Sequence, residues 1–136
     1  DLGCGNGALL ETICAAHSGV VPYGIEQDSA RLAHVAHTLP DYRANFVNGD
    51  LFTTDWPVDR VDVALLMLGR LGEVEAAQAA ALVDVLAARA RHLVIYAYGD
   101  VAQQIGDLPT LAQAYGIAVN DDFSSAQTAA FTAQVR

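Results

Sequence analysis

The stretch DLGCGNG at positions 1–7, followed directly by ALLETIC at positions 8–14, decides how this chain folds. Glycine stands at alternate positions, Gly3, Gly5 and Gly7, and because glycine has no Cβ the backbone can turn sharply out of a strand and approach a ligand closely. The apolar residues that follow open a helix, whose unpaired N–H groups face the same place. The stretch therefore predicts a nucleotide-type site at a strand-to-helix turn.

An acidic residue at the end of the next apolar run supports this interpretation. Glu26 ends the run Tyr23-Gly24-Ile25, 19 residues after Gly7. At this distance the second strand of a nucleotide-binding β-α-β unit offers a carboxylate to ribose hydroxyls. The alternative for Glu26 is an exposed acid on the approach to a helix. A third apolar run ends at residues 48–51, and a fourth spans residues 62–68.

In these four segments the chain resembles the class I S-adenosylmethionine-dependent methyltransferases, whose first motif reads acidic-x-Gly-x-Gly-x-Gly. The resemblance extends over essentially the whole chain, with the family's order and spacing. It implies an α/β fold, a Rossmann-like doubly wound and mainly parallel sheet with an antiparallel edge hairpin, in a single domain over residues 1–136. Family members have apolar residues ahead of the motif that form the central strand. Because this chain begins at Asp1, we expect most of the first strand and an amino-terminal segment to be missing, and the chain to fold poorly alone.

The dinucleotide-binding dehydrogenases are the nearest alternative, since they also combine a glycine loop with a ribose-binding acid. Their fingerprint is Gly-x-Gly-x-x-Gly. Here the third glycine is Gly7, one residue too early, and position 8 is alanine. The spacing therefore disfavours a nicotinamide cofactor.

Hydrophobic periodicity predicts alternating strands and helices along the rest of the chain. Such alternation implies a doubly wound sheet with right-handed crossovers. A broken helical region, interrupted by Gly106 and Pro109, is expected before the last two strands. In the helix at 73–91 we expect Val74, Ala77, Ala81, Leu82, Val85 and Leu86 to face inward. The predicted helices are 7–17, 28–39 (capped by Asp28 or Ser29 and ended by Pro40) and 73–91, and the predicted strands are 20–25, 44–48, 61–68, 92–98, 117–120 and 128–135.

The resemblance also implies a cofactor site for S-adenosylmethionine at the carboxyl ends of the strands. Asp1 would accept hydrogen bonds near the methionine ammonium, and Glu26 would accept both ribose hydroxyls, for which a carboxylate has enough acceptor sites. Asp50 would accept a hydrogen bond from the adenine amino group. The alternative is that Asp50 only forms a turn after Gly49. The implied cofactor residues are Asp1, Gly3, Gly5, Gly7, Glu26, Gln27, Asp50, Leu51, Met67 and Leu68.

The methyl acceptor is less constrained by the sequence, and no catalytic residue is assigned. Strand 61–68 ends in MLGR instead of the Asn/Asp-Pro-Pro-aromatic motif of amino-group and nucleic-acid methyltransferases, and no carboxylate cluster for a metal follows it. Three polar groups remain on the substrate side: Arg70, Tyr98 and Asp100. Arg70 could bind a carboxylate bidentately or be a solvated loop cation.

The composition of the chain limits the classes of molecule that we expect it to bind. The formal net charge is −9, and all seven cationic residues are arginine. An acidic chain without basic clusters lacks the footprint of nucleic-acid binding and is repelled by anionic membranes. No apolar run reaches the roughly 20 residues of a membrane span, and two cysteines make neither a disulfide framework nor a metal site. We therefore expect a cytoplasmic protein with a small-molecule acceptor and no metal.

These observations predict an S-adenosylmethionine-dependent methyltransferase. The alternative is a non-catalytic S-adenosylmethionine-binding module of the same fold. A third option, aminopropyl transfer from a decarboxylated cofactor, is disfavoured because its acidic substrate site is not evident.

Overall fold

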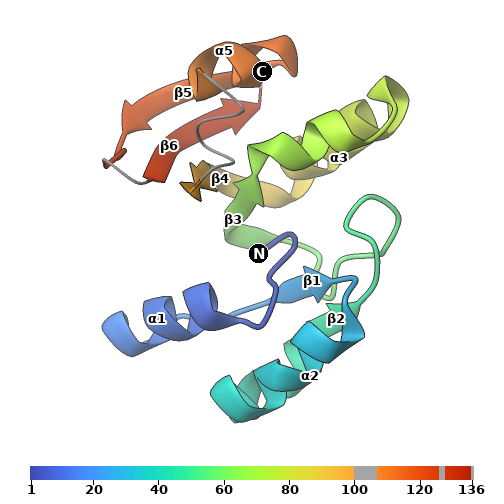
Figure 1. Ribbon diagram of the computed structural model, residues 1–136, viewed down its shortest axis with the longest axis vertical. Coiled ribbons are helices and arrows are strands. Elements are labelled where there is room, and N and C mark those ends of the chain that lie inside the picture. The colour runs from blue at the N-terminus through green and yellow to red at the C-terminus, as the bar shows by residue number, and fades with distance from the viewer. Residues whose placement is uncertain (100–106, 126–127, 136) are drawn as a thin grey trace. The chain divides into compact units, whose positions relative to one another are not determined.

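The structure is a computed structural model that describes residues 1–99, 107–125 and 128–135. The chain divides into two compact units, Asp1–Asp59 and Arg60–Arg136, and each combines helices with strands (Figure 1). Among the described residues no helix combines the length and apolar character that crossing a bilayer requires. The single-domain organisation and the cytoplasmic location both stay predictions.

The first unit pairs two short parallel strands and surrounds the glycine stretch. Strands β1 and β2 are in register from Gly24 opposite Phe46 to Glu26 opposite Asn48, and Leu2 forms an isolated parallel bridge with Ile25. The elements are α1 (Ala8–Ala16), β1 (Gly24–Glu26), α2 (Ser29–Thr38), η1 (Pro40–Asn45) and β2 (Phe46–Asn48).

The local sequence explains where these elements begin. Helix α1 starts after Gly7, whose φ of 80° only glycine adopts readily. Asp28 caps α2, since its side chain accepts hydrogen bonds from the backbone N–H groups of Ala30 and Arg31 at 2.9 and 3.2 Å. The strand predicted from residue 20 begins only at Gly24, because Pro22 has no N–H for a ladder.

The second unit contains a four-stranded sheet of order β3-β4-β6-β5. Strand β3 runs parallel to β4, whereas β6 is antiparallel to both β4 and β5. The antiparallel edge hairpin is thus confirmed, and β6 has the predicted bounds. The elements are β3 (Val61–Met67), η2 (Leu68–Glu73), α3 (Ala76–Arg89), β4 (Ala90–Tyr98), α5 (Leu108–Ala114), β5 (Ile117–Asp122) and β6 (Thr128–Val135).

Burial alternates along the strands of this sheet, so its two faces differ. The apolar run of β3 is nearly continuous, a pattern typical of strands covered on both faces, yet Val63 is 49% exposed. On the opposite face of the sheet, Leu66 and Ile95 are in register with each other, and both are fully buried. Helix α3, which connects β3 to β4, packs against β4 and β6.

The long alanine-rich helix is shorter and rotated relative to the prediction. Helix α3 begins at Ala76, three residues later than predicted, after the 3-10 helix η2, and it buries residues spaced i, i+3, i+4 and i+7. Ala77 and Ala81 are exposed instead. Pro109 lies in the first turn of α5, where a missing N–H has no cost, and does not interrupt it. Residues 100–106 lie outside the described part of the chain. The buried residues of α3 are Ala79, Leu82, Val83 and Leu86.

Candidate functional site

The glycine loop at residues 1–7 folds back onto strand β1 through its own backbone. The N–H groups of Gly3 and Cys4 both donate to the Ile25 carbonyl, at 2.9 and 3.0 Å, and the N–H of Gly7 donates to the Cys4 carbonyl at 3.0 Å. Gly3, Gly5 and Gly7 have φ values of 87°, 57° and 80°. These left-handed conformations explain why glycine recurs at alternate positions.

The Glu26 side chain connects the end of β1 to the glycine loop. One carboxylate oxygen accepts a hydrogen bond from the Gly5 N–H at 2.8 Å, and the other accepts from the Asp28 N–H at 2.8 Å. The residue is 7% exposed and is the one charged residue among the buried residues of the described chain. A carboxylate has about four acceptor sites, so each oxygen retains capacity for one further donor. The predicted pairing of loop and acid is therefore present in the geometry.

Asn48 is a positioning residue that the sequence reasoning missed. Its side-chain amide donates to the carbonyl groups of Glu26 and Gln27 at 2.8 and 3.1 Å, and the Gly49 N–H donates to the same Glu26 carbonyl at 3.0 Å. These bonds fix the backbone on which the Glu26 carboxylate is mounted. The signal in the sequence was an amide residue at the end of the third apolar run. Its register with Glu26 is given by the structure.

Asp1 and Leu51 flank the same loop. The Oδ1 atom of Asp1 is buried and has no hydrogen-bond partner within the part of the chain that the structure describes. Leaving a buried carboxylate oxygen unpaired is costly, so the position fits a donor supplied by a ligand. The Leu51 side chain lies 3.7 Å from where a Cβ on Gly3 would stand, so it packs against the loop.

Asp50 and Gln27 are exposed. The Asp50 side chain accepts a hydrogen bond from the Phe52 N–H at 2.9 Å, and its carbonyl accepts from Thr53 and Thr54. The turn-forming role is thus present in this structure, while its contact with adenine stays a prediction. Gln27 uses its backbone carbonyl to bind Asn48 and leaves its side chain in solvent, so its place beside adenine also stays a prediction.

Cys4 packs beneath the loop as a buried thiol. Burial raises its pKa to about 11, so the side chain is protonated at neutral pH. Its sulfur lies only 2.6 Å from where a Cβ on Gly24 would stand. This contact requires glycine at position 24, and the protonated thiol acts as a small apolar side chain.

The predicted residues of the second unit differ in accessibility. Met67 is half-buried at the end of β3, whereas Leu68 is fully buried, so only the Leu68 backbone can face a ligand. The Arg70 guanidinium donates to both carboxylate oxygens of Glu73 at 3.2 and 2.9 Å. Tyr98 is 55% exposed at the end of β4. Asp100 lies outside the described residues.

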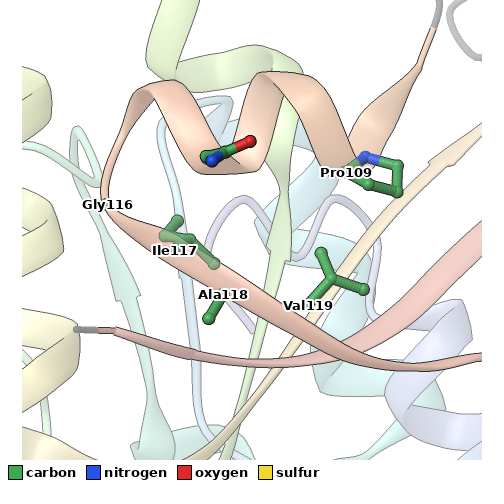
Figure 2. Close-up of a pocket in the computed structure, with 6 residues that line it drawn as sticks. Pro109, Gly116, Ile117, Ala118 and Val119 are labelled. Carbon is green, nitrogen blue, oxygen red and sulfur yellow. The ribbon is translucent and has the colours of Figure 1, made fainter.

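A surface hollow of about 250 Å³ lies between α5 and β5, lined by Pro109, Gln113, Gly116 and residues 117–119 (Figure 2). Strand β5 runs in the same direction as β4, because β6 is antiparallel to both. Gly116 and Ile117 thus lie at the amino end of β5. Ligands of open α/β sheets bind beyond the carboxyl ends of the strands. The hollow is therefore not part of the candidate site.

The chain matches known proteins in structure but not in the sequence comparisons. No protein-family model and no curated protein matches the chain. A TehB-like S-adenosylmethionine-dependent methyltransferase from Corynebacterium glutamicum matches over 100% of this chain and 78% of its own, with 16% identity and a TM-score of 0.72. An O-methyltransferase from neocarzinostatin biosynthesis matches over 100% of this chain and 48% of its own, with 18% identity and a TM-score of 0.71.

The chain has the fold of the class I S-adenosylmethionine-dependent methyltransferases. A 16S rRNA methyltransferase, RmtF, shares this methyltransferase fold over 100% of the chain and 55% of its own length, with 21% identity and a TM-score of 0.71. The chain spans only about half the length of the last two proteins. The neocarzinostatin enzyme was solved with S-adenosyl-L-homocysteine and a dihydroxynaphthoic acid, and RmtF with S-adenosyl-L-homocysteine. Proteins with this methyltransferase fold thus act on unlike acceptors.

Proposed function

We propose that the protein binds S-adenosylmethionine and transfers its methyl group to a small-molecule acceptor. The observation that best supports this is the hydrogen bond at 2.8 Å between the Gly5 N–H and the Glu26 carboxylate. It joins the glycine loop to the acid at the end of β1, the two features that a nucleoside-binding β-α-β unit requires. The shared fold with methyltransferases supports the same proposal.

The residues of the first unit fit the cofactor's chemistry. Glu26 retains two acceptor sites, which match the two hydroxyl donors of a ribose. The unpaired Asp1 Oδ1 would accept a hydrogen bond from an ammonium group. A Cβ on Gly5 would meet no atom within 4 Å, so the loop faces open space at that position. Bound S-adenosylmethionine supplies an electrophilic methyl group on a sulfonium, and the chain has to hold and align it.

The backbone of the loop argues against a phosphate-bearing cofactor. Five successive or neighbouring amides, those of Gly3, Cys4, Gly5, Gly7 and Ala8, already donate to acceptors within the first unit. The Ala8 N–H donates to the Asn6 side chain at 3.2 Å. Loops that cradle phosphates leave such N–H groups directed at the ligand. The loop therefore fits a nucleoside without a pyrophosphate.

The proposed class of methyl acceptor is inferred from the charges of this chain. A net charge of −9 without a single lysine disfavours an RNA substrate of the kind that RmtF modifies. Arg70 is ion-paired with Glu73, which lowers its capacity to bind a carboxylate of the acceptor. Both observations favour a small acceptor without strong negative charge.

Calorimetric titration of S-adenosylmethionine, and separately of NADH, tests the cofactor assignment. We expect micromolar binding of S-adenosylmethionine alone. Tight NADH binding would refute the cofactor proposal. Transfer of a radioactive methyl group to any small acceptor distinguishes the enzyme from a non-catalytic module, which would bind the cofactor without turnover.

A further inference from the structure

A row of side chains crosses the sheet of the second unit close to its carboxyl edge. Tyr96 in β4 stands in register with Ala130 in β6 and, on its other side, with Met67 at the end of β3. The backbone N–H of Phe123, directly after β5, donates to the Ala130 carbonyl at 2.8 Å. The four residues therefore lie on one level of the sheet, and one of them, Met67, is among the predicted cofactor residues.

Two aromatic side chains at this edge of the sheet, Tyr98 and Phe123, are exposed, and Tyr96 is half-buried. Side chains alternate along a strand, so Tyr96 and Tyr98 lie opposite the buried face of Ile95 and Ala97. The two tyrosine rings are stacked, with centroids 6.2 Å apart and an interplanar angle of 9°. Tyr98 is 55% exposed and Phe123 is 67% exposed. Contiguous exposed apolar patches mark interaction sites, whereas single exposed apolar side chains are ordinary.

Ala130 lies between Tyr96 and Phe123 in this row. Neighbouring strands lie about 4.8 Å apart, so β4 and the residue opposite Ala130 are separated by roughly 10 Å. Ala130 contributes only a methyl group between them. Aromatic rings prefer centroid separations of about 4.5–7 Å. A ring placed over Ala130 would thus reach the aromatic side chains on both sides.

The segment that holds Phe123 is fixed and acidic. Ser124 Oγ accepts from the Ala130 N–H at 3.2 Å, and the Ser124 N–H donates to Asp122 at 2.8 Å. The hydrogen bonds from Ser124 hold the pKa of Asp122 below its usual value, so this carboxylate is ionised at neutral pH. The Thr132 hydroxyl donates to Asp121 Oδ2 at 2.9 Å, and Thr132 is on the same face as Tyr96 because it is in register with Val94.

We propose that Tyr96, Tyr98 and Phe123 bind the methyl acceptor, and that the acceptor is a planar aromatic molecule without negative charge. The aromatic row supplies the stacking surface, and the carboxylates of Asp121 and Asp122 repel anionic ring substituents. This inference rests on the proposed function, since it assigns the acceptor class of that same site.

Binding of 2-naphthol and of 2-naphthoate, in the presence of S-adenosylhomocysteine, tests the inference. Saturation-transfer NMR titrations give a Kd for each probe on the natural protein. We expect 2-naphthol to bind and 2-naphthoate to bind more weakly. Tyr98→Leu and Phe123→Ser should each weaken 2-naphthol binding roughly 2- to 12-fold, the equivalent of one aromatic pair.

Val63→Thr is the matched control, because Val63 lies on the same face at the amino-terminal end of β3 and is 49% exposed. It should leave naphthol binding unchanged, and circular dichroism verifies that each variant is folded. Equal loss in Val63→Thr, or equal binding of the two probes, would overturn the inference. S-adenosylhomocysteine is titrated separately: its binding without naphthol binding overturns the inference alone, whereas failure of both overturns the proposed function as well.

Discussion

Replacing Glu26 by glutamine is the sharpest test of the cofactor site. The carboxylate accepts one backbone N–H on each oxygen, both at 2.8 Å, and is 7% exposed. Glutamine has the same shape but only one acceptor oxygen, so either the Gly5 or the Asp28 amide would face an NH₂ donor. An unsatisfied buried donor costs about 1–3 kcal/mol. At roughly 4 °C per kcal/mol for a chain of this size, the melting temperature should fall by roughly 4 to 12 °C.

Cofactor binding should weaken as well, and for a separate reason. The variant loses the negative charge that strengthens the bond to a ribose hydroxyl, and it puts a donor where an acceptor is needed. A loss of about 1–3 kcal/mol corresponds to a roughly 5- to 150-fold higher Kd for S-adenosylmethionine. Isothermal titration calorimetry measures the Kd at a temperature where both proteins are folded, and scanning calorimetry measures the melting temperature.

The control is Asp84→Asn, which removes one charge from the exposed surface of α3. It should change neither the free energy of unfolding nor the free energy of cofactor binding by more than about 0.5 kcal/mol. An unchanged Kd in Glu26→Gln would refute the ribose assignment. An unchanged melting temperature would refute the claim that the carboxylate holds the glycine loop.

Three further predictions follow from the packing and hydrogen bonds of the first unit. Gly24→Ala should destabilise the fold by about 1–3 kcal/mol in urea denaturation, because its Cβ would lie 2.6 Å from Cys4 Sγ and from the Phe46 ring; an unchanged midpoint would contradict the packing. Asn48→Ala should lower stability by about 0.5–1.5 kcal/mol and weaken S-adenosylmethionine binding, since it loses the bonds to the Glu26 and Gln27 carbonyls; Asn120→Ala, at an exposed asparagine of β5, is the control. Iodoacetamide at pH 8 should alkylate half-buried Cys14 before Cys4, because burial raises the Cys4 pKa to about 11; mass spectrometry gives the order, and prior labelling of Cys4 would contradict it.

The sequence predicted the site best where one chemical requirement determines the residue. Left-handed φ values require glycine at positions 3, 5 and 7, and a β-α-β unit sets the distance from this loop to Glu26. The alternation of residues 128–135 identified β6 because only strands have a period of two. These features are local, so one sequence contains them.

Other features depend on contacts between distant residues, which one sequence does not specify. The reach of Asn48 to the carbonyl groups of β1 depends on strand register. The buried stripe of α3 was misassigned because alanine is apolar on every side of the helix, so shape and not hydrophobicity selects Ala79 over Ala77. The ion pair of Arg70 with Glu73 likewise depends on the conformation of η2.

The hydrogen-bonding character of the loop explains which ligand chemistry the site accepts. The amides of Gly3, Cys4, Gly5, Gly7 and Ala8 already donate within the first unit. Free acceptor capacity lies on the Asp1 Oδ1 atom and the Glu26 carboxylate. A pyrophosphate offers only acceptors and negative charge, so it would face two carboxylates at a loop where five amides are already used. A nucleoside that presents hydroxyl and ammonium donors and a positive charge complements every one of these groups. In the proposed site, the Gly5 to Glu26 bond would thus adapt a glycine-rich loop of the kind that serves phosphates elsewhere to a cationic cofactor.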